Sequence, residues 1–142
     1  MPSACGAHIK YAWMLQVDAV LNQANPVSGT LYPVLAASED VRIISISINN
    51  IWTVQPSPLD AELAIDGVTV RHNKINPASA TSYYAIIEEA NSMANQSLAT
   101  ISPALTRSFL WEGQSVAVGA RTTGGTVSNL TSRVKWARLL PT

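Results

Sequence analysis

The sequence carries little charge. Asp, Glu, Lys and Arg make up 13% of its 142 residues, against about 25% in typical globular domains, while 47% of the residues are hydrophobic. No uninterrupted apolar run approaches the roughly 18 residues of a membrane helix, so a membrane span does not account for the apolar content. The deficit predicts a β-rich subunit whose flanks are covered by copies of itself or by a larger scaffold, and no membrane partner.

An excess of positive charge is also missing. Nine Lys and Arg balance nine Asp and Glu, and the basic residues are spread along the chain. A nucleic-acid surface needs a concentrated positive field that displaces phosphate counterions. The one basic cluster, Arg133, Lys135 and Arg138, is interpreted as a solvated or partner-facing stripe, because Arg133 and Lys135 share one face of a strand. We expect no nucleic-acid partner.

Cysteine and histidine are too few for the common metal and catalytic sites. Cys5 is the one cysteine, which rules out an intramolecular disulfide framework. Cys5 and His8 are three residues apart, but a structural zinc site needs four protein ligands and there is no second such pair. His72 has no recognisable catalytic partner spacing, and the adjacent Glu88 and Glu89 point to opposite faces of a strand. We therefore expect no metal, no cofactor and no enzymatic activity.

Helical periodicity is scarce, and alternation with a period of two residues dominates, which predicts strands with one face toward a core. The clearest strand is Val41 to Ile51, which is rich in β-branched residues and expected to be central. It places Ile44, Ile46 and Ile48 on one face, and Ile43, Ser45, Ser47 and Asn49 on the other. Further strands are expected over 12–20, 29–35, 109–111, 115–120 and 131–140.

The most specific local signal is a hairpin turn. Leu63, Ile65, Val68 and Val70 flank Asp66-Gly67, and a two-residue Asp-Gly loop favours the type I′ turn that matches strand twist. A second signal is Pro33, which cannot donate to a strand ladder. Its strand is therefore expected at a sheet edge or at a bulge.

Residues 73–105 are less clear. The segment 73–81 is interpreted as a loop, and 91–105 as polar and irregular. Tyr83 to Ala90 fits a strand with Tyr84, Ile86 and Glu88 on one side, or a short helix, and the strand is favoured. About eight strands with turn signals every 8–12 residues predict an all-β fold, an antiparallel β-sandwich or jelly roll, with a barrel as the alternative.

The first ten residues differ from the rest. They contain Pro2, Gly6 and several small side chains, which is typical of an extended arm that orders on a partner. They lack the charged start and continuous apolar core of a secretory leader, so export by that route is not expected. We expect an N-terminal arm over 1–10 and one β domain over 11–142.

The four tryptophans suggest binding surfaces. Trp111 and Trp136 lie in apolar strand contexts and are interpreted as core or interface anchors, whereas Trp52, beside a proline-rich loop, is the best candidate for an exposed contact. Exposed Trp or Tyr rings could stack on sugars, so a carbohydrate- or receptor-binding module of a viral tail or spike is the alternative function.

Two parts of the chain carry a resemblance to a known family. The C-terminal third contains FLWEGQSVAVGAR (109–121), TTGGT (122–126) and LTSRVKWARL (130–139), and the hairpin contains IDGV (65–68). Together these segments resemble trimeric decoration, or cement, proteins of tailed bacteriophage heads, which are small jelly-roll-like virion proteins. The resemblance covers about half of the chain and rests on pattern.

The resemblance implies a structural protein without catalytic residues. It implies a homotrimer seated on the capsid surface over junctions between major capsid protein subunits, after synthesis in the host cytoplasm. If the arm reaches the shell, Ile9, Tyr11 and Trp13 would be its anchors, and with Trp52 they form the set of interface candidates. We further expect both faces of 41–51 and 115–120 to be covered in the assembly. The C-terminal strand is expected to keep one face toward water or an acidic partner.

Overall fold

A computed structural model describes residues 16–77, 81–89 and 109–138, and these ranges hold nine strands and no helix. None of the described segments could therefore cross a membrane as an apolar helix. The strands are β2 (Gln16–Ala24), β3 (Leu31–Ala36), β4 (Val41–Ile51), β5 (Leu59–Ile65), β6 (Val68–Ile75), β7 (Ser82–Glu89), β8 (Phe109–Leu110), β9 (Ser115–Thr122) and β10 (Asn129–Arg138).

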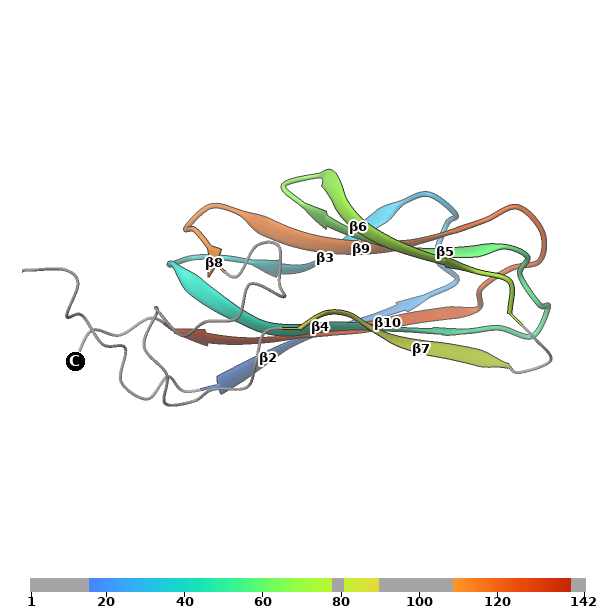
Figure 1. Ribbon diagram of the computed structural model, residues 1–142, viewed down its shortest axis with the longest axis horizontal. Coiled ribbons are helices and arrows are strands. Elements are labelled where there is room, and N and C mark those ends of the chain that lie inside the picture. The colour runs from blue at the N-terminus through green and yellow to red at the C-terminus, as the bar shows by residue number, and fades with distance from the viewer. Residues whose placement is uncertain (1–15, 78–80, 90–108, 139–142) are drawn as a thin grey trace, which may run out of the picture.

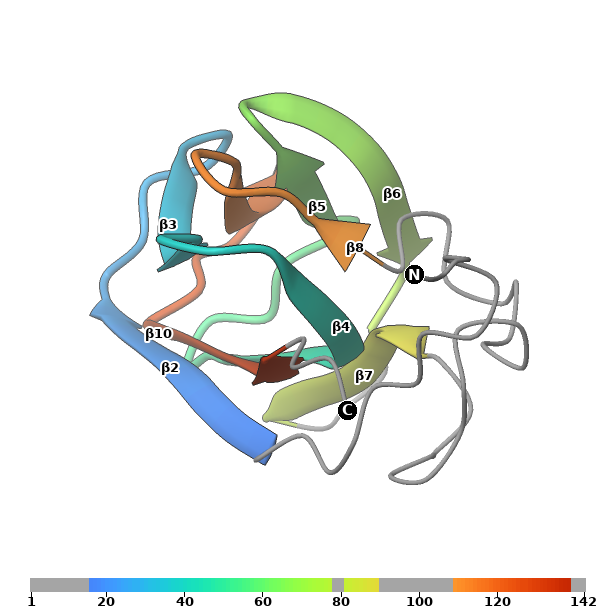
Figure 2. The same cartoon turned by 90° about the vertical axis from the view of Figure 1, so that its left-hand side faces the viewer.

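The strands form two stacked antiparallel sheets (Figures 1 and 2). One sheet has the order β2-β10-β4-β7, with the short β8 paired to the start of β4. The other has the order β3-β9-β5-β6. Consecutive strands mostly alternate between the two sheets, and the inner faces of both sheets enclose the buried residues.

The pairing follows a nested pattern. β5 pairs with β6, β4 with β7, β3 with β9, and β2 with β10, so each pair encloses the previous one. The innermost connection is the Asp66-Gly67 turn, where φ is 51° and 80°, and Ile65 faces Val68. A long hairpin that is rolled up in this way is a jelly roll, and the predicted fold class is confirmed.

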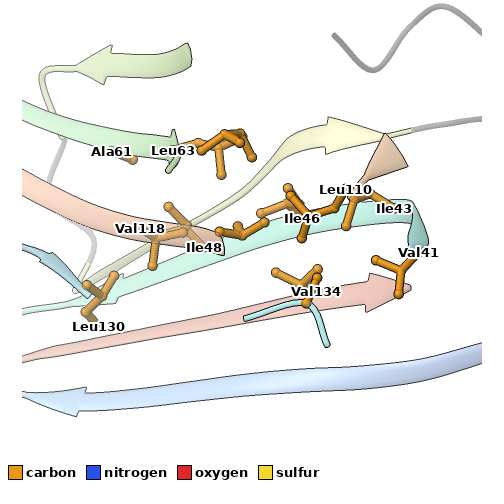
Figure 3. Packing of buried hydrophobic residues seen from close by; sticks show 13 residues of the cluster. Val41, Ile43, Ile46, Ile48, Ala61, Leu63, Leu110, Val118, Leu130 and Val134 are labelled. Carbon is orange, nitrogen blue, oxygen red and sulfur yellow. The ribbon is translucent and has the colours of Figure 1, made fainter. Parts of the chain in front are cut away.

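The core lies between the sheets (Figure 3). Ile43, Ile46 and Ile48 of β4 face Leu63 of β5 and Val118 of β9, and each of these side chains is at most 2% exposed. These side chains meet because residues two apart on a strand share a face, so the alternation of each strand directs them toward the space between the sheets. Burying such side chains contributes about 1.5–3 kcal/mol each.

One detail of β4 differs from the prediction. Lys135 and Trp136 of β10 face Ser45 and Ile43 of β4, so Ile44 has no directly opposite partner and forms a β-bulge. The extra residue shifts the alternation by one position. Ile43 therefore lies in the core with Ile46 and Ile48, whereas Ile44 is only half-buried, and its predicted place on their face is wrong.

Other local predictions are confirmed or adjusted. Pro33 lies on the edge strand β3, next to a register irregularity, as expected. The ambiguous segment is the strand β7, with Tyr84 and Ile86 exposed on the same side. The loop expected from residue 73 begins later, because β6 continues to Ile75. The predicted arm over 1–10, with Ile9, and the candidates Tyr11 and Trp13 lie outside the described residues.

Candidate functional site

The outer face of the β2-β10-β4-β7 sheet is hollowed along β4. The hollow has a volume of about 380 Å³, and we call it the outer trough. Its floor is formed by Ser45, Ser47 and Asn49 of β4. Because Ser has a short side chain, the larger residues of the neighbouring strands rise above the floor on both sides.

The register aligns the trough residues in rows across the sheet. In one row Val20 of β2 lies beside Arg133 of β10, which lies beside Ser47 of β4, which lies beside Ile86 of β7. The next row places Thr131, Asn49 and Tyr84 side by side. The wall on β7 is therefore apolar and aromatic, while the wall on β10 is polar and cationic.

The charges of the trough are unequal. Arg133 Nε lies 3.6 Å from Asp18 Oδ2, and Lys135 also faces Asp18 in the register of β10 and β2. Among the described side chains of this face, one carboxylate thus faces two cations. Since the ion pair is more than a third exposed, it contributes little to stability. The stripe formed by Arg133 and Lys135 does lie on one face, as predicted.

Large apolar side chains on this face are exposed. Val20 is 61% exposed, Tyr84 62% and Ile86 51%. A sheet face that combines exposed Tyr and Ile with Arg has the composition of a protein interface. The alternation of the sequence YYAII carried this signal, but only the pairing of β7 with β4 shows that Tyr84 and Ile86 border a hollow.

The outer face of the other sheet differs. His72 Nδ1 lies 3.2 Å from Asp60 Oδ1, and Arg121 Nε lies 3.5 Å from Glu62 Oε2. Each of these cationic or titratable groups has a carboxylate partner. His72 is 61% exposed in this pair, and it lines neither the outer trough nor the smaller hollow at the β9 end. The described part of the chain brings no three His, Cys, Asp or Glu side chains together as metal ligands.

Two of the tryptophans differ in exposure from the sequence prediction. Trp52 is only 3% exposed and packs in a second core cluster with Leu59, Ala120 and Val127, so the expectation that it is an exposed contact is wrong. The physical reason is that Trp52 continues the alternation of β4, in which Ile48 and Asn50 are buried and Ile51 is exposed. Trp136 is half-buried against the main core, but Trp111 is 54% exposed and is not a core residue.

Comparison with known proteins adds resemblances in shape only. No protein-family model matches the sequence, and no curated protein matches it. A chain from a structure of turnip yellow mosaic virus matches with a TM-score of 0.43 and 7% identity, over 100% of this chain and 87% of that chain. A chain from a Nora virus structure matches with a TM-score of 0.41 and 10% identity, over 86% of this chain and 55% of that chain.

A third match is the insecticidal delta-endotoxin Cry8Ea1 from Bacillus thuringiensis. Its TM-score is 0.29 at 14% identity, over 89% of this chain and 18% of that chain. The chain thus spans about half the length of the Nora virus chain and less than a fifth of the toxin. Because all three TM-scores lie below 0.5, we rest the fold assignment on strand order and register alone.

Proposed function

We propose that this protein is a structural subunit of a virion. In this role it decorates the capsid surface as a cement protein, forms a homotrimer over junctions between major capsid protein subunits, and reinforces the shell. The observation that carries the proposal is the outer trough, where Val20, Tyr84 and Ile86 are exposed beside a polar and cationic wall, as in a protein interface.

Two further features support a structural role. The first is the jelly-roll strand order, an architecture that viral capsid domains share with lectin domains. Fold alone does not determine function, so the second feature matters more. The chain is poor in charge, which suits close packing against copies and neighbours, because a charge buried without a partner is costly. The proposed role involves no catalysis, cofactor or nucleic acid.

Self-assembly and shell reinforcement are tested separately. Light scattering on the purified chain should give the mass of three chains at micromolar concentration, and a stable monomer would argue against a constitutive trimer. Parent capsids with the protein bound should then disrupt at a higher temperature than capsids without it. An unchanged disruption temperature would remove the cement role while leaving the trimer intact.

A carbohydrate-binding role is the second candidate, and one observation favours it. The exposed ring of Tyr84 lies beside Asn49, which in turn lies beside Thr131, so a stacking surface adjoins hydrogen-bonding groups. A glycan array tests this role directly. Binding that is lost on Tyr84→Ala, with the thermal unfolding temperature unchanged, would promote it over the structural role.

A further inference from the structure

The outer trough offers a docking site with two different walls. Tyr84 and Ile86 form the apolar wall, and Arg133 and Lys135 form the cationic wall. A matching partner surface needs a large exposed apolar side chain with carboxylates next to it.

The two ends of the sandwich differ in charge. At one end, on the right in Figure 1, the turns 25–30, 52–58 and 123–128 contain no Asp, Glu, Lys or Arg. Hydrogen bonds join these turns, from Asn25 N to Ser128 O at 2.9 Å and from Ser57 N to Gly124 O at 3.0 Å. This end could supply no carboxylate to the cations of the trough.

The opposite end, near β8 and the start of β4 in Figure 1, is formed by the turns 37–40, 66–67 and 111–114, and we call it the acidic end. Hydrogen bonds hold the three turns together. Ala37 N donates to Gln114 O at 2.9 Å, Glu112 N to Asp40 Oδ1 at 2.8 Å, and Ser115 N to Asp66 Oδ1 at 2.9 Å. The end is therefore one continuous surface.

The acidic end carries the groups that the trough requires. Its three turns hold four of the nine acidic residues of the chain and no Lys or Arg; the four are Glu39, Asp40, Asp66 and Glu112. Trp111, 54% exposed, lies directly before Glu112. The nearest cation along the chain, Arg42, is only 2% exposed, and burial lowers the pKa of its guanidinium.

We propose that the acidic end of one copy docks into the outer trough of a second copy. Trp111 would contact the wall of Tyr84 and Ile86, and Glu112 with Asp40 would face Arg133 and Lys135. This contact rests on the proposed self-assembling role and names the surfaces that carry it. Because two different surfaces meet, the contact is heterologous, and it closes into a ring such as a trimer if the rotation between copies permits.

Two variants test the contact. Arg133→Glu with Lys135→Glu reverses the cationic wall, and Trp111→Ser with Glu112→Gln removes the apolar side chain and a carboxylate from the acidic end. Each variant alone should raise the dissociation constant of self-association at least about 10-fold, because each removes charges that attract the opposite surface across the contact. Circular dichroism and thermal melting confirm that both variants are folded.

Mixing the two variants gives the sharper result. The trough of one variant and the acidic end of the other are still intact, so the mixture should form 1:1 dimers that cannot grow, visible by light scattering. The matched control is Arg71→Glu with Lys74→Glu, which makes the same change of charge on β6 of the other sheet and should assemble like the wild type.

The outcomes separate the two proposals. If the wild type is oligomeric but the trough variant assembles equally well, or the folded variants form no dimer when mixed, the contact is wrong and self-assembly stands. If the β6 control loses assembly to the same degree, the contact is also wrong, because the effect is general electrostatics. A monomeric wild type at about 100 μM overturns both, and glycan binding lost on Arg133→Glu would then assign the trough to a sugar.

Discussion

Asn50 carries a polar amide inside the apolar core. It is 0% exposed, lies on β4 between Leu130 of β10 and Tyr83 of β7, and neither its Oδ1 nor its Nδ2 has a hydrogen-bond partner in the described chain. A buried polar group without a partner costs roughly 1–3 kcal/mol. Such a residue persists only because the surrounding core is stable enough to tolerate it.

Replacing this amide should stabilise the fold. Asn50→Leu keeps the number and branching of the side-chain heavy atoms and has no unpaired polar atoms, so we expect the free energy of unfolding to rise by about 1 kcal/mol. Urea denaturation followed by tryptophan fluorescence measures the change. The matched control is Ser132→Ala on β10, where Ser132 Oγ donates to Ser47 O at 2.7 Å, and it should lower stability by about 1 kcal/mol. Equal losses for both variants would show that Asn50 is satisfied in solution.

Trp52 is a core residue despite its proline-rich surroundings. Its contacts with Leu59, Ala120 and Val127 lie at the uncharged end, where the two sheets meet. We expect Trp52→Ala to lower the free energy of unfolding by about 3–5 kcal/mol, because it leaves a large cavity. Thermal melting checks this, and a melting temperature like that of the wild type would show that the indole is dispensable to the core.

At the scale of elements, the loop between β9 and β10 is fixed by close backbone contacts. Gly125 has φ of +73°, and a Cβ placed there would overlap the backbone carbonyl oxygen of Gln55. Gly67, in the β5–β6 turn, has φ of +80°, but a Cβ there would meet no atom within 4 Å. A side chain at either position would strain the backbone, but only at Gly125 would it also overlap a neighbouring atom.

This pair predicts two different losses of stability. Gly67→Ala should cost about 1–2 kcal/mol from the left-handed conformation alone. Gly125→Ala adds overlap with a backbone carbonyl and should cost roughly 2–5 kcal/mol in total. Chemical denaturation of both variants measures the difference, and equal losses would mean that the 52–58 turn moves aside without cost.

The strands also show how far pattern alone reaches. The alternation of 41–51 and 115–120 and the Asp-Gly turn at 66–67 identified elements that the structure has at nearly the same bounds. The bulge at Ile44 was not predictable, because it depends on which residues of β10 face β4. A period of two cannot reveal where a partner strand slips by one residue.

At the scale of the molecule, the uneven distribution of charge makes the proposed self-association depend on salt concentration. The acidic end and the cationic wall attract through exposed groups, and such attraction is screened when the Debye length falls from about 10 Å at 0.1 M salt to about 3 Å at 1 M. We expect self-association to weaken about 5-fold or more over this range. Sedimentation of the wild type in increasing NaCl measures it, whereas an interface of apolar contacts alone would be unchanged or strengthened.

The candidate site was only partly accessible from the sequence. Arg133 and Lys135 were placed correctly on one strand face, and an acidic partner was one of the two expectations for that face. Trp52 was misplaced because the proline-rich segment after it indicates a surface loop, although it lies in phase with the buried Ile48 and Asn50 of the strand before it. Tyr84 and Ile86 were assigned to one side of their strand, but their neighbours Asn49 and Ser47 belong to a strand more than thirty residues away.

The sequence by itself determined the β class, most strand positions, the central hairpin turn and the low charge, because alternation and turn chemistry are local properties. The tertiary structure decided how the hairpin rolls up, which brings β2 beside β10 and β3 beside β9 from opposite ends of the domain. It also gathered Glu39, Asp66 and Glu112 at one end and left the other end uncharged. Such gathering depends on pairing between distant strands, so the composition recorded a balance of charge but not its separation in space.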